Sequence, residues 1–237
     1  MNRATITRIG LIISLGIFAV FFLAQSPSKE FDEDRYIAEV QRLIEEKGYN
    51  WTAGKTSVSG LSPSDKKKLL GAVQPPEDVY ASLPAFQAPG DTIEWDYFNW
   101  RDYDAVTPVT SQRACGSCWA FAAVAELESN MLIYDQRFAD LSEQQVMSCN
   151  IYGSGCSGGW SEAAYVLFMS YGSVSEGCMP YEADDTVPCR EDLCTPLGRI
   201  VGYESVQNSV NIIKQALMRG PVWTTFTVDD PFYAYES

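Results

Sequence analysis

The chain has 237 residues, of which 46% are hydrophobic and 13% aromatic, so it can bury a globular core. Its 31 acidic and 17 basic residues give a net charge of −14, which argues against a nucleic-acid partner because phosphate binding needs clustered Lys and Arg. None of the residues is histidine. This excludes a mixed Cys/His zinc site, and we expect neither a metal nor another cofactor.

The N-terminus has the composition of a targeting segment. Arg3 and Arg8 lead into an uncharged run over residues 9–24, whose length lies between that of a secretory signal core and that of a membrane span. We expect a signal peptide over residues 1–26 that is cleaved, which would leave no stable membrane span; an uncleaved signal anchor is the alternative. In both cases the rest of the chain enters an oxidising compartment.

Cysteine usage fits that compartment. The seven cysteines are Cys115, Cys118, Cys149, Cys156, Cys178, Cys189 and Cys194. An odd count leaves one thiol over after three pairs, and a leftover thiol in a secreted protein calls for a reason. We therefore expect six of them to form disulfides rather than to bind metal.

The first part of the chain combines a helix with a long loop. Apolar residues at helical spacing predict a helix over 31–47 that ends at Gly48. An N-glycosylation sequon at Asn50 follows. Residues 52–90 have the composition of a loop, and the change in composition near 85–92 indicates a domain boundary.

The second part shows helical patterns first and a strand pattern last. The segment that begins at Cys118 is apolar on nearly every face, which is typical of a buried helix. A helix opens at Ser142 with capping-box spacing, and two more are predicted over 161–171 and 209–219. Residues 222–228, rich in Thr and aromatic residues, predict a strand. This order favours an α+β fold.

The most informative motif is Cys115-Gly116-Ser117-Cys118-Trp119. Gln112 lies six positions before Cys118, and Cys149 is followed by Cys156-Ser157-Gly158-Gly159-Trp160. Shorter matches are Leu141-Ser142-Glu143-Gln144, Pro180-Tyr181 and Gly220-Pro221-Val222. Together these segments resemble the papain family of cysteine peptidases, whose signature around the nucleophile is C-G-[SA]-C-[WY].

The resemblance implies a chemistry, that of a cysteine-type endopeptidase without a cofactor. Cys118 would attack a peptide carbonyl and form an acyl-enzyme, while the Gln112 side chain and the Cys118 N–H would hold the oxyanion. The expected partners are protein or peptide substrates and the chain's own propeptide. The implied substrate-binding residues are Gly116, Gly158, Gly159 and Trp160, where glycine lets an extended backbone approach closely.

The resemblance also implies an architecture. A helical domain with a buried central helix would join an incomplete β-barrel domain, with a propeptide over 27–90 and a papain-like peptidase domain over 91–237. Trp51-Thr52-Ala53-Gly54 resembles cathepsin B-like proregions, and such proenzymes are extracellular or directed to the lysosome or vacuole. On this template the disulfides would be Cys115–Cys156, Cys149–Cys189 and Cys178–Cys194, with Cys118 left free.

The sequence departs from the family pattern at the catalytic base. The family's His and Asn lie about 130–150 residues after the cysteine, which is beyond Ser237. We expect the chain to be a fragment of an active cysteine endopeptidase. The alternative is a truncated, catalytically inactive relative with a peptide-binding or regulatory role. A structural protein with a coincidental cysteine pattern is the third hypothesis.

Overall fold

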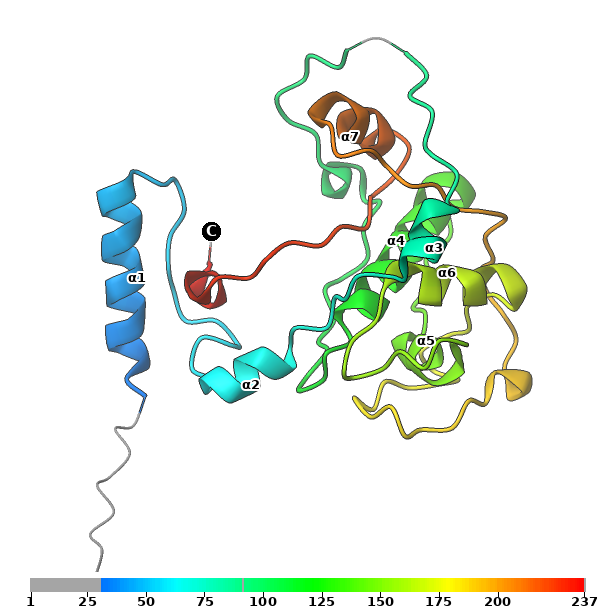
Figure 1. Ribbon diagram of the computed structural model, residues 1–237, viewed down its shortest axis with the longest axis horizontal. Helices are drawn as coiled ribbons and strands as arrows, with labels where there is room; N and C mark the ends of the chain where they lie inside the picture. Colours follow the sequence, from blue (N-terminus) through cyan, green and yellow to red (C-terminus); the bar gives the residue numbers. More distant parts are fainter. Residues whose placement is uncertain (1–30, 91, 237) are drawn as a thin grey trace, which may run out of the picture.

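The structure, a computed structural model, describes residues 31–90 and 92–236 (Figure 1). The expected signal peptide, 1–26, lies outside the described residues. The α-helices are α1 (Glu33–Lys47), α2 (Pro63–Lys68), α3 (Glu77–Ala81), α4 (Cys118–Asp135), α5 (Glu143–Cys149), α6 (Ser161–Ser170) and α7 (Val210–Leu217). The 3-10 helices are η1 (Trp100–Tyr103), η2 (Glu191–Leu193) and η3 (Asp230–Ala234).

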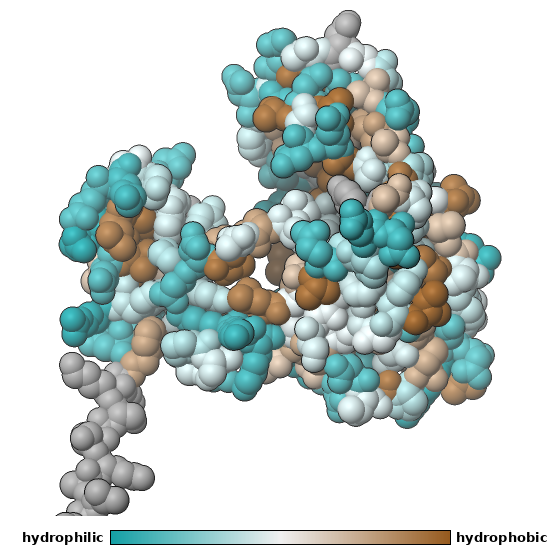
Figure 2. Space-filling model, in the orientation of Figure 1, coloured by the Kyte–Doolittle hydropathy of each residue, from teal (hydrophilic) through white to brown (hydrophobic). Residues whose placement is uncertain are grey.

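These elements form two groups (Figure 1). Helices α4, α5 and α6 pack together in the larger body, whereas α1 and α2 lie with η3 in a smaller group that we call the α1 lobe. Residues far apart in the sequence thus lie side by side, because η3 belongs to the C-terminal end of the chain. Figure 2 shows hydrophilic residues over the outer side of the α1 lobe and hydrophobic ones at its narrow junction with the body.

The core of the larger body surrounds α4, as the sequence predicts. Trp119, Ala120 and Val124 of α4 are fully buried against Leu141 and against Phe168 of α6. A helix packed on several sides needs apolar residues on several faces, which explains why α4 lacks a hydrophilic stripe. Removing these side chains from water is the main source of stability of this body.

Local signals account for most helix ends. Gly48 ends α1 with a left-handed φ of 67°, as predicted. Ser142 begins α5, and its hydroxyl accepts a hydrogen bond from the Gln145 N–H at 2.9 Å. The reciprocal bond of a capping box is not made, because the Gln145 Oε1 accepts from the Val174 N–H and the Ser142 N–H donates to the Val174 carbonyl.

Two sequence predictions are wrong in detail. The expected loop over 52–90 contains α2 and α3, which are too short for a periodic pattern; α2 starts from a Ser62 cap followed by Pro63. Residues 222–228 form no strand, because none of the segments that the structure describes pairs with them. The described part of the chain holds only isolated β-bridges, so it does not confirm the incomplete β-barrel that the resemblance implied.

The part of the chain that the structure describes contains no candidate membrane span. In those ranges no helix combines the length and the apolar character that crossing a bilayer requires.

Candidate active site

Cys118 is the first residue of α4 and holds the one free thiol among the described cysteines. Its side chain is partly exposed, whereas the preceding Ser117 is fully buried. The Ser117 hydroxyl lies 2.6 Å from the Tyr181 hydroxyl, which donates to the Gln112 carbonyl at 2.8 Å. The N–H groups of the first helical turn have no partner within the helix, so negative charge is favoured at this end of α4.

Disulfides hold the loops around this helix end. The structure pairs Cys115–Cys156, Cys149–Cys189 and Cys178–Cys194, which are the pairs that the family resemblance implied. The Gly116 N–H also donates to the Cys156 carbonyl at 3.0 Å. Cys149, Cys189 and Glu191 have the spacing of metal ligands, but their two sulfurs form a disulfide and offer no thiolate.

The partly buried Gln112 side chain contacts the first part of the chain. Its side-chain amide donates to the Leu69 carbonyl at 2.9 Å and to the Cys115 carbonyl at 2.7 Å. The first bond joins residues 43 positions apart. The amide that the resemblance assigns to an oxyanion therefore already holds a peptide carbonyl.

Residues 69–73, which we call the blocking segment, continue along the Gly158-Gly159 loop. The Gly159 N–H donates to the Gly71 carbonyl at 2.8 Å, and the Val73 N–H donates to the Gly159 carbonyl at 3.0 Å. Ala72 and Gly159 form a parallel β-bridge. The loop binds an extended peptide backbone through both main-chain groups of Gly159.

Glycine is required on both sides of this contact. A Cβ added to Gly71 would lie 1.6 Å from the Gly116 carbonyl oxygen. A Cβ added to Gly159 would lie 2.4 Å from the Trp119 ring. The structure thus brings Gln112, Gly116 and Gly159 together around the blocking segment. Gly116 is two residues before Cys118 in the sequence.

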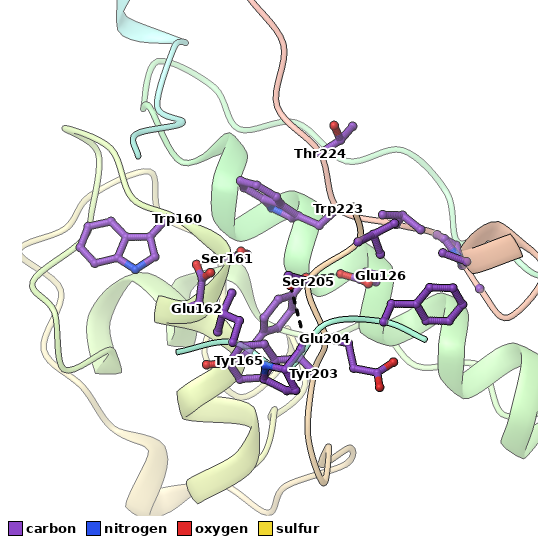
Figure 3. A pocket seen from close by; sticks show the side chains of 18 of the residues that line it. Glu126, Trp160, Ser161, Glu162, Tyr165, Tyr203, Glu204, Ser205, Trp223 and Thr224 are labelled. Atoms are coloured by element: carbon purple, nitrogen blue, oxygen red, sulfur yellow. Dashed lines mark hydrogen bonds between the residues drawn. The ribbon is translucent and has the colours of Figure 1, made fainter. Parts of the chain in front are cut away.

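A cavity of about 1210 Å³ opens beside Trp160 (Figure 3). Its wall includes Glu126 of α4, Tyr165 of α6 and Trp223 from the segment after α7. The Trp160 indole N–H is buried and has no hydrogen-bond partner within the described residues. The substrate-binding role expected for Trp160 stays a prediction.

Glu126 is a cavity residue that the sequence analysis did not identify. Burial raises the pKa of its carboxyl to about 7, and the hydrogen bond donated by the Tyr165 hydroxyl offsets part of that rise. A carboxyl group in this environment carries a proton in mildly acidic solution. The signal in the sequence is a glutamate inside an otherwise apolar helix, but spacing alone does not show that it faces a cavity.

A second group of carboxyls, of which Glu128 and Glu143 are buried and Glu176 is partly buried, contacts the segments around Thr110 and Tyr181. Burial raises the pKa of Glu143 to about 7 and raises that of Glu128 and Glu176 as well. Thr107 and the Leu141 N–H donate to Glu128, which ties the centre of α4 to the loop before α5. These carboxyls support the loops that carry Gln112 and Tyr181 rather than line the cavity.

Known proteins provide an independent comparison. Residues 95–237 match the family described as papain family cysteine protease. Stem bromelain of Ananas comosus is 38% identical over 141 residues, which cover 59% of this chain and 66% of bromelain. Falcipain-2b of Plasmodium falciparum (isolate 3D7) is 35% identical over 141 residues, which cover 59% of this chain and 29% of falcipain-2b.

A solved structure shares the fold as well. The recombinant stem bromelain precursor superposes with a TM-score of 0.65 at 28% identity, covering 86% of this chain and 66% of the precursor. The chain belongs to the papain family of cysteine proteases. The matched part of the chain spans 66% of the length of stem bromelain and 29% of the length of falcipain-2b.

Proposed function

We propose that this chain contains the nucleophile and the oxyanion-binding residues of a papain-type cysteine endopeptidase. The prosegment that blocks them precedes them in the same chain. Cys118 would attack the carbonyl of a peptide bond, and the tetrahedral oxyanion would be held by the Gln112 amide and the Cys118 N–H. The C–N bond of the tetrahedral intermediate would then break, which leaves a thioester on Cys118, and the amine would leave with the thiol proton that the family's His carries. Water would release the acyl group and restore the thiol.

The observation that carries this proposal is the binding of the blocking segment. Gln112 holds the Leu69 carbonyl, and Gly159 pairs with the backbone on both sides of Ala72. These are main-chain contacts, so the same groups can bind a peptide of another sequence. The free thiol stands at the helix end two residues after Gly116, against whose carbonyl the blocking segment packs.

The proposed domains are those expected from the sequence. The signal peptide would be residues 1–26, the propeptide 27–90 and the peptidase domain 91–237; the family match covers most of the last range. The resemblance of Trp51–Gly54 to cathepsin B-like proregions stays a proposal. Three disulfides fit the secretory pathway, and we propose a lysosomal, vacuolar or extracellular proenzyme.

The alternative is a catalytically inactive member of the family that binds peptides or proregions. The specific observation in its favour is the absence of histidine from all 237 residues. Catalysis needs a base that takes the thiol proton and later gives a proton to the leaving amine. No residue of this sequence offers an imidazole for that purpose.

The native transcript beyond the codon for Ser237 separates the two proposals. A coding sequence with His and then Asn at the family spacing supports the peptidase. Its product should hydrolyse a fluorogenic peptide and lose turnover in Cys118→Ala. A stop codon directly after Ser237, together with no turnover by the native protein, overturns the peptidase proposal and favours the binding role.

A further inference from the structure

Lys66 is buried although it is charged. The residue lies on α2, and only 4% of its surface is exposed, whereas its neighbour Lys67 is exposed. Taking an ammonium group out of water is costly unless other groups replace the lost hydration. The structure must therefore supply partners for this side chain.

Those partners are three aromatic rings and one carboxylate, which together we call the cage. The Lys66 Nζ lies 4.3 Å from the ring centroid of Tyr36, 4.9 Å from that of Tyr233 and 5.4 Å from that of Phe31. The Asp230 Oδ1 lies 3.5 Å from the same nitrogen. Each ring is within the range at which a cation interacts favourably with an aromatic face.

The rings come from both ends of the chain. Phe31 and Tyr36 precede or belong to α1, whereas Asp230 and Tyr233 belong to η3, inside the region that matches the peptidase family. The Tyr233 hydroxyl also donates to the Lys66 carbonyl at 3.3 Å, and the Tyr36 hydroxyl donates to the Asp230 carbonyl. The cage therefore closes only when the α1 lobe is assembled (Figure 1).

The cage stands immediately before the blocking segment. The Leu69 carbonyl, which Gln112 holds, is three residues after Lys66, and Gly71 is five residues after it. A lysine fixed in the cage leaves little freedom for the chain between these points. It thereby sets which residue lies against Gly116 and Gly159.

We propose that Lys66 is a cationic latch: its ammonium group, enclosed by Tyr36, Tyr233, Phe31 and Asp230, fastens the prosegment to η3 and fixes the register of the blocking segment. The latch rests on the proposed function only in that the segment it positions shields the Cys118 thiol. Other contacts, such as the Gly54 N–H to the Ala234 carbonyl at 2.8 Å, hold the same lobe without charge.

The test compares two substitutions on one helix in the full chain. Lys66→Met removes the charge at nearly constant volume, and Lys67→Met makes the same change at an exposed position. The readouts are the rate at which iodoacetamide alkylates Cys118 and the hydrogen-exchange rates of the Gly54 and Glu236 amides. Both amides bridge the prosegment and the C-terminal segment, and neither readout requires turnover.

We expect Lys66→Met to accelerate alkylation and both exchange rates about tenfold, with α4 amides unchanged, and Lys67→Met to leave all of them within about twofold. Equal effects of the two substitutions overturn the latch. Faster exchange without faster alkylation overturns its role in the register. Failure of the peptidase proposal would instead appear as absent turnover and would leave these rates as expected.

A general loss of stability in Lys66→Met would show as faster exchange in α4 as well. Lys66→Arg then decides, because it keeps a cation for the rings. Under the proposal this variant retains exchange rates at Gly54 and Glu236 close to those of Lys67→Met. Rates as fast as those of Lys66→Met would show that the cation is not what holds the lobe.

Discussion

A methyl group added at Gly71 should open the candidate active site. The Cβ of Gly71→Ala would stand 1.6 Å from the Gly116 carbonyl oxygen and 2.3 Å from its carbon. Both atoms are backbone, so no side chain can rotate away, and the blocking segment has to leave its place. Three hydrogen bonds would go with it: Gln112 to Leu69, Gly159 to Gly71, and Val73 to Gly159.

The size of the effect follows from those bonds. At about 1 kcal/mol net for each bond, the segment loses about 3 kcal/mol of attachment. That corresponds to about a hundredfold rise in the population with an open site. The alkylation rate of Cys118 by iodoacetamide, followed by intact-mass spectrometry, measures this population because the other six cysteines form disulfides.

Gly90→Ala is the matched control. A Cβ at Gly90 has nothing within 4 Å, so the substitution adds a methyl group without displacing the chain. We expect its alkylation rate to equal that of the unmodified chain. If Gly71→Ala reacted no faster than Gly90→Ala, the blocking segment would not shield the thiol, and the reasoning from the backbone contacts would be refuted.

Two further predictions concern stability. The Glu126 carboxyl has a pKa of about 7 in the folded chain against 4.5 as its ordinary value. Its contribution to the unfolding free energy is therefore fully present below pH 4.5 and is lost as the pH rises through 7. Urea titration should therefore show that the unfolding free energy of Glu126→Gln rises relative to that of the wild type by up to about 3 kcal/mol between pH 4.5 and 8. A difference between the two proteins that does not change with pH would contradict the burial of this carboxyl. Replacing Cys115 and Cys156 together by Ala opens a loop with a sequence separation of 41 and should lower the unfolding free energy by about 4 kcal/mol. Denaturant titration measures this value, and an unchanged midpoint would show that the disulfide does not restrain the unfolded chain.

Several elements were predictable because their causes are local. The apolar faces of the segment from Cys118 predicted a buried helix, and Gly48 marked the end of α1. Ser142 marked the start of α5 through its own hydroxyl. In each case the residues that determine the structure lie within a few positions of one another.

Other elements were missed because their causes are distant or absent. Helix α2 is a six-residue element, too short for a period to be visible. Residues 222–228 have the composition of a strand, but a strand needs a neighbour that supplies hydrogen bonds, and none of the described residues does so. Glu126 was overlooked because its cavity is formed by segments around Tyr165 and Trp223.

The sequence by itself determined the family, the central buried helix, the free cysteine and, through the family resemblance, the three disulfide pairs. Only the tertiary structure decided what occupies the candidate site. The bond from Gln112 to Leu69 joins residues 43 positions apart, and the contact between Lys66 and Asp230 joins residues 164 positions apart. Such contacts depend on how the whole chain closes on itself, and no local pattern of residues encodes them.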